Sequence, residues 1–334
     1  MPIFNPEVIA MKLFKKAIRL IPRCVIFLLI LALLLLATSY AFAPKDYWEK
    51  HRNGEVPVAH AVLNEPENSI DVLFVGDSLV YSAISPMDIW KDYGFTSFDC
   101  AGSAQQMFAS EELLTAVLEQ QKPKAVVFEP YSLFRKEKAG SKLAVQISSL
   151  FPVFTYHDRW KNIDEACFSG FFGVTNTDDF KGFALKWRVE KAKPLNYMKE
   201  TDKEKEVPAY NEEYFESILN ICEKAGTELI LISVPSQKCW NYAKHNGIQE
   251  LADKYGVEYV DLNLMNDRLS INWEKDTRDA GDHLNYYGAK KVSDFLGEYL
   301  QSRYSLPDRR GDSEYSQWNE ALERYKPFVD APKK

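Results

Sequence analysis

The sequence predicts an α/β domain, in which a parallel β-sheet lies between layers of helices, attached to a single transmembrane helix. Two observations predict the domain: short apolar runs recur along the chain, and stretches with the apolar spacing of surface helices separate them. A third observation, an uncharged apolar run near the N-terminus, predicts the attachment. At 334 residues the chain has room for one large domain with appendages.

The uncharged run covers residues 24–43, and a helix of about 20 such residues spans the roughly 30 Å of hydrocarbon in a bilayer. Five Lys and Arg residues precede the run closely, whereas charges of both signs follow it. The positive-inside bias therefore predicts a cytoplasmic N-terminus (1–20), a transmembrane helix (21–43) and an extracellular remainder. A cleaved signal peptide is the alternative, because Ala-Phe-Ala at 41–43 resembles a cleavage site. The length of the run and the following Pro44 favour a retained single-pass anchor.

Composition shifts divide the rest of the chain. Residues 44–67 are polar and lack periodicity, which predicts a linker, and residues 68–305 form the predicted domain. Between about 131 and 208 the alternation of strands and helices fails over too long a stretch for an ordinary loop, which predicts an insertion over the strand ends. Residues 306–334 are predicted to be a tail that packs on the domain through one short helix. The apolar positions of that helix are Trp318, Leu322 and Tyr325.

Each predicted strand is a short apolar run, and two of the runs are apolar nearly throughout, as is typical of strands covered on both faces. The predicted strands are Ile70–Val75, Ser97–Cys100, Ala125–Phe128, Glu228–Val234 and Glu258–Leu262. The predicted helices are residues 104–121, 211–225, 246–255 and 286–302. This alternation favours right-handed crossovers, and such sheets carry their sites just beyond the carboxyl ends of the strands.

Charge and cysteine content narrow the function classes. A net charge of −7 and a pI of about 5.5 argue against nucleic acid as a partner. Of five cysteines, Cys24 lies in the membrane run, and the other four are widely spaced without a CxxC or Cys/His cluster. We therefore interpret them as buried free thiols and predict no metal site.

The first predicted strand ends in Gly76-Asp77-Ser78, at the edge where parallel sheets carry their chemistry. A serine hydroxyl is a poor nucleophile until a base takes its proton, and a third group must orient that base. Among five histidines, His283 has a carboxylate-rich setting before a helix start, where Asn285 is a candidate N-cap. Alone, Gly-Asp-Ser after a strand is more often an ordinary turn. Joined with the His283 loop and with Gly102, whose N–H could face an oxyanion, it favours a catalytic site.

Gly76-Asp77-Ser78-Leu79, together with the late His283-Leu284-Asn285, resembles the sequence blocks of the SGNH/GDSL hydrolase superfamily. The similarity covers roughly residues 68–303. Within the superfamily the chain most resembles membrane-anchored bacterial members akin to the D-alanyl transfer protein of lipoteichoic acid synthesis and to polysaccharide O-acetyl-modifying proteins. The resemblance implies a three-layer, parallel-sheet SGNH/flavodoxin-like fold.

The resemblance also implies roles for individual residues. Ser78 would be the nucleophile and His283 the general base. The backbone N–H groups of Ser78 and Gly102 would form part of the oxyanion hole, and Asp77 would order the turn.

Two positions depart from the family pattern. The family usually has an aspartate three residues before the histidine, where this chain has Ala280. Asp279 and Asp282 flank that position, and both remain candidates for orienting the imidazole. The family's third block ends a strand with Gly-x-Asn, whose amide donates to the oxyanion, but the matching strand here ends in Glu129. Loss of one such donor costs about 10²–10³ in rate in other enzymes. Either the insertion supplies a donor, or turnover is slow, or the protein is not a hydrolase.

Three side chains are candidate substrate contacts. Glu129 could carry a raised pKa and act as acid or base, or could support the insertion through an ion pair with Arg135. His157 and Arg159 lie beside Trp160, a combination of cation and ring that suits sugars or phosphates. The favoured alternative is that Trp160 and Phe154 belong to the core of the insertion, with His157 as a hydrogen-bonded partner there.

These features predict a membrane-anchored, extracellular serine esterase or acyltransferase that acts on acetyl or D-alanyl esters of cell-envelope glycopolymers. The implied partners are a surface polysaccharide or teichoic-acid-like substrate, the membrane through the chain's own helix, and a membrane-bound acyltransferase. No nucleic acid, metal or organic cofactor is expected. One alternative is a non-catalytic SGNH-fold protein that binds glycans or assembles the cell surface, which the missing Gly-x-Asn favours. A secreted lipase is a weaker alternative, because nothing in the sequence indicates a lipid-handling segment.

Overall fold

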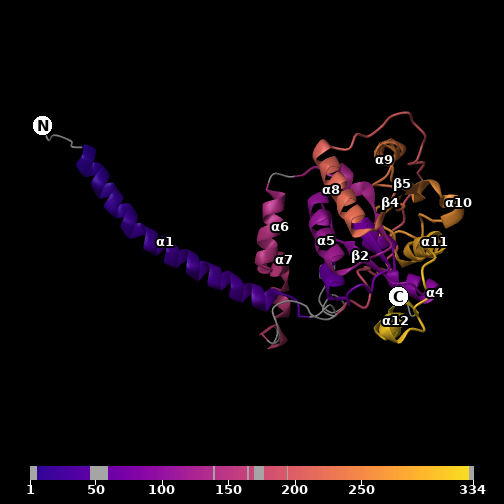
Figure 1. The fold of residues 1–334 in the computed structure, drawn as a ribbon, viewed down its shortest axis with the longest axis horizontal. Coiled ribbons are helices and arrows are strands. Elements are labelled where there is room, and N and C mark those ends of the chain that lie inside the picture. Colours follow the sequence, from indigo (N-terminus) through magenta and orange to yellow (C-terminus); the bar gives the residue numbers. More distant parts are fainter. Residues whose placement is uncertain are drawn as a thin grey trace. The chain divides into compact units, whose positions relative to one another are not determined.

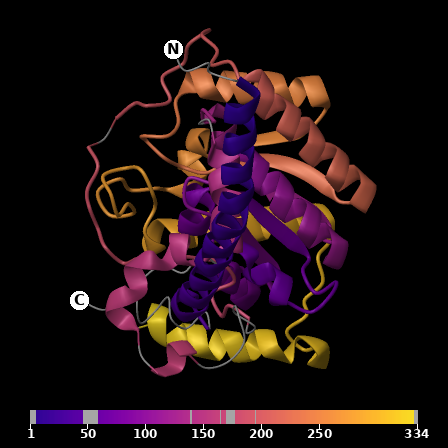
Figure 2. The same ribbon diagram turned by 90° about the vertical axis from the view of Figure 1, so that its left-hand side faces the viewer.

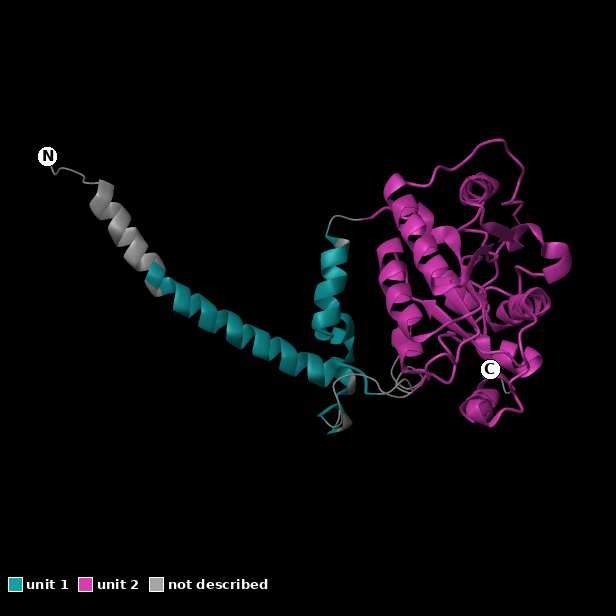
Figure 3. Cartoon of the chain, viewed as in Figure 1, with its two compact units in different colours: residues 1–55, 140–175 teal, residues 56–139, 176–334 magenta. Residues whose placement is uncertain are grey.

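The structure is a computed structural model of the chain and describes residues 6–45, 59–137, 140–163, 165–168, 177–193 and 195–330. The chain divides into two compact units, coloured separately in Figure 3. Unit 1 comprises Met1–Glu55 and Gly140–Thr175, and unit 2 comprises Val56–Ala139 and Asn176–Lys334. Unit 1 contains the long N-terminal helix, and unit 2 contains the β-sheet (Figure 1).

In the described part of unit 2, five parallel strands form one sheet with the order β2-β1-β3-β4-β5. The strands are β1 (Val72–Gly76), β2 (Ser97–Ala101), β3 (Ala125–Phe128), β4 (Glu228–Ser233) and β5 (Glu258–Asp261). Each predicted strand is confirmed to within two residues at either end. Strand β1 lies between β2 and β3, and the register pairs Gly76 with Ala101 and Val75 with Phe128. The residues that follow these three strands therefore meet at one edge of the sheet.

Helices cover both faces of the sheet. On one side α5 (Met107–Gln120) contacts α8 (Ala209–Ala225), and the two lie side by side in Figure 1. On the other side α11 (Tyr286–Tyr304) contacts α3 (Ser78–Ala83) and α4 (Pro86–Tyr93). The grouping follows from right-handed crossovers between parallel strands. The predicted three-layer α/β fold is confirmed.

The four predicted helices of the domain correspond to α5, α8, α9 (Tyr242–Tyr255) and α11. The short helices α3 and α4 were not predicted, although α4 has clear local signals. The Ser85 hydroxyl caps it by accepting the N–H of Asp88, Pro86 stands in its first turn, and Gly94 ends it with a left-handed φ of 80°.

The C-terminal helix α12 (Ser316–Val329) is the yellow helix in Figure 2. Its residues Trp318, Leu322 and Tyr325 are buried. The Trp318 ring lies 5.4 Å from that of Trp90, and the Tyr325 hydroxyl lies 2.9 Å from the Ser85 hydroxyl, so the tail packs on α4.

Short elements complete the described chain. They are η1 (Ala59–Asn64), η2 (Pro130–Phe134), α6 (Ser141–Leu150), α7 (Val153–Tyr156), η3 (His157–Asn162), η4 (Glu165–Phe168), η5 (Leu262–Leu264), α10 (Asn266–Leu269) and η6 (Ser313–Tyr315). Within the predicted linker, residues 46–58 lie outside the described residues, and η1 contacts β2 and α5.

The stretch predicted as an insertion divides between the two units: residues 140–175 group with unit 1, and residues 131–139 and 176–208 group with unit 2. In unit 2, residues 177–193 run along the sheet edge and the loop before α11. Their backbone hydrogen bonds join Asp99 to Lys181, Ala184 to Tyr81, Glu190 to Thr277 and Ala192 to Trp273.

Unit 1 is built on the helix α1 (Pro6–Phe42), in which the 23 residues Leu20–Phe42 are long and apolar enough to cross a membrane. The end of α1 packs on the short helices of the same unit. Ser39 Oγ accepts the N–H of Val153 at 3.2 Å, and the Tyr40 hydroxyl donates to the carbonyl of Phe168 at 3.2 Å. Large apolar side chains of these short helices remain exposed: Leu143, Val145, Ile147, Leu150, Phe154, Trp160 and Phe168.

Candidate active site

Ser78 follows the interior strand β1 as the first residue of α3. Asp77 caps this helix, because its Oδ1 accepts the backbone N–H two residues further on at 2.9 Å. Gly76 leaves no room for a side chain, since a Cβ there would lie 2.7 Å from Val80 Cγ2 and 2.9 Å from the Cβ of Glu129. The local structure thus explains why Gly and Asp precede the serine. Ser78 itself is partly exposed at the carboxyl end of β1.

Asp77 also ties the serine turn to the segment after β3. Its side chain is fully buried, and its Oδ2 accepts a hydrogen bond from Arg135 Nε at 3.0 Å and a second from Arg135 Nη2. A buried carboxylate needs such a partner, because an uncompensated charge in the interior is costly.

His283 lies in a tight loop directly before α11. The Thr277 hydroxyl donates to the carbonyl of His283 at 2.9 Å and accepts the N–H of Gly281 at 2.8 Å. Asn285 caps α11 and donates to the carbonyl of Lys275 at 2.7 Å. Gly281 and the residue before it have positive φ values of 92° and 58°, so the chain reverses between Asp279 and His283. The loop is held by its own polar contacts before any substrate is present.

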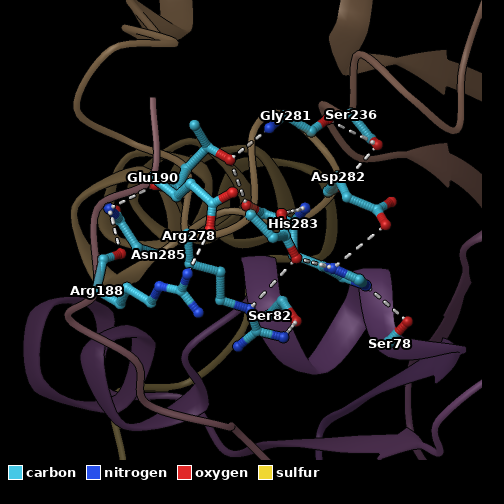
Figure 4. A network of polar contacts seen from close by, with 12 residues as sticks. Ser78, Ser82, Arg188, Glu190, Ser236, Arg278, Gly281, Asp282, His283 and Asn285 are labelled. Atoms are coloured by element: carbon cyan, nitrogen blue, oxygen red, sulfur yellow. Dashed lines mark hydrogen bonds and ion pairs between the residues drawn. The ribbon is translucent and has the colours of Figure 1, made fainter. Parts of the chain in front are cut away.

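The loop places the imidazole between a hydroxyl and a carboxylate. His283 Nε2 lies 2.8 Å from Ser78 Oγ (Figure 4). Its Nδ1 lies 2.6 Å from Oδ2 of Asp279. The second oxygen of Asp279 accepts the backbone N–H of His283 at 2.6 Å. Ser78 and His283 are 205 positions apart in the sequence. The structure therefore joins the three side chains in one hydrogen-bonded series.

Asp282, the other candidate for orienting the imidazole, lies farther from it. Its nearest carboxylate oxygen is 3.9 Å from His283 Nδ1, and its Oδ1 instead accepts from the Cys239 thiol at 3.2 Å. Of the two carboxylates that the sequence left open, the structure places Asp279 against the imidazole.

Two opposing effects act on the pKa of Asp279. Partial burial raises it, but the hydrogen bonds from the side chain and the backbone N–H of His283, together with the nearby charges, outweigh burial. The pKa of Asp279 therefore lies below its ordinary value, and the carboxylate is ionised at neutral pH.

Gly102, the second predicted oxyanion donor, directly follows β2. Because the register pairs Gly76 with Ala101, Gly102 lies beside the serine turn. A Cβ at Gly102 would lie 2.9 Å from Oε1 of Gln105, so the backbone is closely approached there. The N–H of Ser78 belongs to the first turn of a helix and has no intrahelical acceptor. Their role as oxyanion donors stays a prediction.

Glu129 lies at the end of β3, but its side chain is buried, with 1 % of the residue exposed. Its carboxyl accepts the indole N–H of Trp240 at 3.2 Å and the backbone N–H of Tyr131 at 3.1 Å. Burial, and then the charge of Asp77, raise the pKa of Glu129 well above its ordinary value. The suggested ion pair with Arg135 does not form, because Arg135 pairs with Asp77. Glu129 is a buried acid that offers no surface to a substrate.

His157 and Arg159 belong to η3 of unit 1. Arg159 is 8 % exposed and donates to the carbonyl of Phe42. His157 is exposed and lies 3.1 Å from the carboxylate of Asp158. The interpretation of Trp160 and Phe154 as core of the insertion is wrong, since these residues are 62 % and 48 % exposed. Contact of His157 and Arg159 with a substrate stays a prediction.

Among the described residues one group of three side chains has the spacing of a metal site. The ligand atoms of Asp279, Asp282 and His283 lie within 4.8 Å of one another. Both imidazole nitrogens already have hydrogen-bond partners, one of them Ser78. The arrangement suits proton transfer better than metal coordination.

Sequence reasoning missed the residues that support the loop. Lys238 Nζ donates to the carbonyl of Asp279 at 2.6 Å, and the Ser236 hydroxyl donates to that of Asp282 at 2.7 Å. Arg278 donates to the hydroxyl of Ser82 in α3 at 2.8 Å and so joins the loop to the serine helix (Figure 4). The only sequence signal for the first two was a polar run just after β4, at a strand end.

No family model and no curated protein matches the chain. Solved structures do match it. A GDSL-like lipase from Bacteroides thetaiotaomicron is 11 % identical, with 70 % of this chain and 88 % of that chain covered and a TM-score of 0.35. A lipase/acylhydrolase from Enterococcus faecalis is 10 % identical (72 % and 100 % covered, TM-score 0.39), and a psychrotrophic esterase from Pseudoalteromonas sp. is 9 % identical (70 % and 99 %, TM-score 0.39). Each of these three structures is that of a lipase, an acylhydrolase or an esterase.

Proposed function

We propose that this protein is a membrane-anchored serine esterase or O-acyltransferase that acts outside the cytoplasmic membrane on acyl esters of cell-envelope glycopolymers. The observation that carries the proposal is the unbroken series Asp279–His283–Ser78, with contacts of 2.6 and 2.8 Å. A carboxylate, an imidazole and a hydroxyl in this order meet the requirements of an activated serine nucleophile.

In the proposed reaction Ser78 Oγ attacks the ester carbonyl and gives its proton to Nε2 of His283. Asp279 accepts a hydrogen bond from Nδ1–H of His283. This bond leaves Nε2 unprotonated, so that Nε2 can act as the base, and the carboxylate stabilises the imidazolium that forms. The N–H groups of Ser78 and Gly102 stabilise the oxyanion. His283 then protonates the departing polymer hydroxyl. Water or a sugar hydroxyl, deprotonated by His283, finally takes the acyl group from Ser78.

The cellular side of the proposal rests on the N-terminal segment. Leu20–Phe42 could span a bilayer, and the Lys and Arg residues before it favour a cytoplasmic N-terminus, which puts the serine outside. An extracellular esterase held at the membrane can reach acetyl or D-alanyl esters of wall polymers and receive acyl groups from a membrane-bound acyltransferase.

The test is covalent labelling of the full-length protein in detergent micelles with a fluorophosphonate, followed by mass spectrometry of the modified peptide and turnover of an activated acetyl ester. We expect a single phosphonyl group on Ser78, and Ser78→Ala should abolish both labelling and turnover. Ser302→Ala, at an exposed position on α11, is the matched control and should change neither. Absence of label on Ser78 together with an unchanged rate in Ser78→Ala would overturn the proposal.

A second candidate function is that of a non-catalytic glycan-binding or surface-assembly protein. The observation that favours it is the buried Glu129 at the end of β3, where a side-chain amide would otherwise donate to the oxyanion. Binding and labelling measurements distinguish the two candidate functions. A non-catalytic binding protein would bind wall glycans, but its Ser78 would not react with the phosphonate.

A further inference from the structure

The short helices of unit 1 expose many apolar side chains. Among the described residues after α1, eleven large apolar side chains are exposed, and seven of them belong to residues 143–168. We call these seven the apolar surface of unit 1: Leu143, Val145, Ile147, Leu150, Phe154, Trp160 and Phe168. Single exposed apolar residues are normal, but a group of them on neighbouring elements marks a site of interaction.

The helix α6 carries a regular apolar stripe within this surface. Leu143, Ile147 and Leu150 recur at intervals of four and three residues, which puts them on one side of the helix, whereas Lys142 and Gln146 fall on the other. Leu143 and Leu150 are 60 % and 67 % exposed. A helix of ten residues is marginal in water, because most helical stability comes from packing of the apolar side. The stripe of α6 therefore requires an apolar partner.

The short helices are attached to the last turn of α1, where the apolar span ends. Helix α7 contacts α1, and Ser39 of that turn is fully buried and accepts the N–H of Val153. Arg159 of η3 donates to the carbonyl of Phe42, the last residue of the span. Figure 3 shows the short helices beside this end of α1. If Leu20–Phe42 crosses a bilayer, the fold brings the apolar surface of unit 1 to the level where the hydrocarbon ends.

The side chains at this level are of the types found between lipid and water. Trp160 is exposed, and Lys161 Nζ lies 5.3 Å from its ring centroid. At the end of α1, Lys45 Nζ lies 3.6 Å from the ring centroid of Tyr40. Trp and Tyr are enriched at membrane interfaces, and Lys extends an apolar stem towards water. Residues 140–175 contain three basic and three acidic residues, so net charge gives them no preference for an anionic surface.

We propose that the apolar surface of unit 1 lies in the outer leaflet of the bilayer, as an interfacial contact in addition to the transmembrane helix. The inference rests on the membrane anchorage in the proposed function. An amphipathic helix in this position buries its apolar side at the boundary of the acyl chains and leaves its polar side among the headgroups. The chain passes between the two units three times, so a docked unit 1 ties unit 2 to the leaflet through three chain connections.

Quenching by brominated lipid tests the contact. Full-length protein is placed in phosphatidylcholine nanodiscs with or without bromine near the headgroup end of the acyl chains. The signal of one indole is the difference between the native protein and its Trp160→Phe or Trp187→Phe variant. We expect bromine to quench the Trp160 signal by about half or more, and that of Trp187, a half-buried residue of unit 2, far less. Added phosphatidylglycerol should change neither signal, because residues 140–175 carry no net charge.

Paired substitutions localise the effect. Leu143→Glu puts a charge into the stripe of α6 and should lower the quenching of Trp160 and speed amide hydrogen exchange of α6 in nanodiscs about tenfold. Leu143 lies in the first turn, where a carboxylate favours a helix, so the faster exchange would report lost lipid contact. Val189→Glu, which adds the same charge at an exposed apolar position of unit 2, should change neither measurement.

An unquenched Trp160 in nanodiscs would overturn the inference. Protection of α6 amides without quenching of Trp160 would overturn it as well, because unit 2 or a second copy of the chain would then cover the stripe. Equal effects of Leu143→Glu and Val189→Glu would show that the stripe has no part in the contact.

The inference and the proposed function fail in different ways. If the fluorophosphonate labels Ser78 but lipid does not quench Trp160, only the interfacial contact is wrong. If Ser78 is inert but Trp160 is quenched, the catalytic proposal is wrong and the lipid contact stands. Release of the full-length protein from membranes by alkaline carbonate would contradict the anchorage itself, and with it the interfacial contact.

Discussion

The loop before α11 and the end of β3 form two sides of the same candidate site, and they differ in what they provide. The loop holds His283 2.8 Å from Ser78 and 2.6 Å from Asp279, with every contact that proton transfer from the serine requires. The end of β3 instead carries the buried acid Glu129, at the position where the SGNH/GDSL pattern that the sequence resembles has an oxyanion donor. In the proposed reaction, activation of the nucleophile and stabilisation of the oxyanion would therefore depend on separate segments, so that one can be complete while the other is altered.

The largest effect is expected on the loop side, from His283→Ala. Without the imidazole no group takes the proton of Ser78, and kcat on an activated ester should fall about 10⁴- to 10⁶-fold. His245→Ala is the matched control, because His245 lies 2.9 Å from a carboxylate of Asp261, yet no hydrogen bond joins it to Ser78 in the described residues. Equal losses in the two variants would show that the His283 contact has no catalytic part.

Substitution of the two loop carboxylates, Asp279 and Asp282, should lower kcat by very different amounts. Asp279→Asn leaves the imidazole without the carboxylate 2.6 Å from its Nδ1, and kcat should fall about 10⁴-fold. Asp282→Asn should change kcat less than about tenfold. The Asp282 carboxylate lies 3.9 Å from Nδ1 of His283, too far to fix the tautomer of the imidazole. The measurement is steady-state hydrolysis at pH 7 to 8, where Asp279, with its lowered pKa, is ionised. A larger loss in Asp282→Asn would reverse the assignment.

On the β3 side the largest effect should be on stability. Arg135→Met leaves the fully buried Asp77 without its ion pair, which typically costs about 3 kcal/mol or more. Thermal unfolding at pH 7 should therefore show a Tm lower by several degrees. Arg310→Met removes an exposed arginine paired with Asp308 and should shift Tm little. A small shift in Arg135→Met would mean that Asp77 is compensated in another way.

The smallest effect should come from Glu129→Gln and should depend on pH. The pKa of Glu129 is raised in the folded state, so folding binds a proton, and the stability of the native protein falls as pH rises from the unfolded pKa towards the folded one. Glutamine can still accept the Trp240 N–H and carries no charge. The variant should match the native protein near pH 4.5 and exceed its stability by about 1 kcal/mol at pH 8. Parallel Tm profiles over this range would contradict the raised pKa.

Much of the fold could be predicted because its signals are local. The central strand β3 is an apolar run buried throughout, as is typical of a strand covered on both faces, and Ala125–Phe128 was predicted with its observed bounds. The short helix Pro86–Tyr93 was missed, although Ser85, Pro86 and Gly94 mark its ends, because eight residues are too few for a helical period to stand out.

The ion-pair partners of charged side chains could not be predicted from local sequence signals. Arg135 is six positions from Glu129 in the sequence but pairs with Asp77, 58 positions away, which is the carboxylate that needs a countercharge. Distance along the sequence is a poor guide to ion-pair partners, because residues from the ends of neighbouring strands can pair although they are far apart in the chain.

The sequence by itself determined that Ser78 follows the first strand of a parallel sheet and that His283 lies in the loop before the last helix, because apolar period and helix-start signals depend on short segments of chain. Only the tertiary structure decided that Asp279 rather than Asp282 faces the imidazole. Adjacent residues of a loop point in directions set by the backbone turn, and here the positive φ values of Ala280 and Gly281 turn the chain so that Asp279 reaches His283.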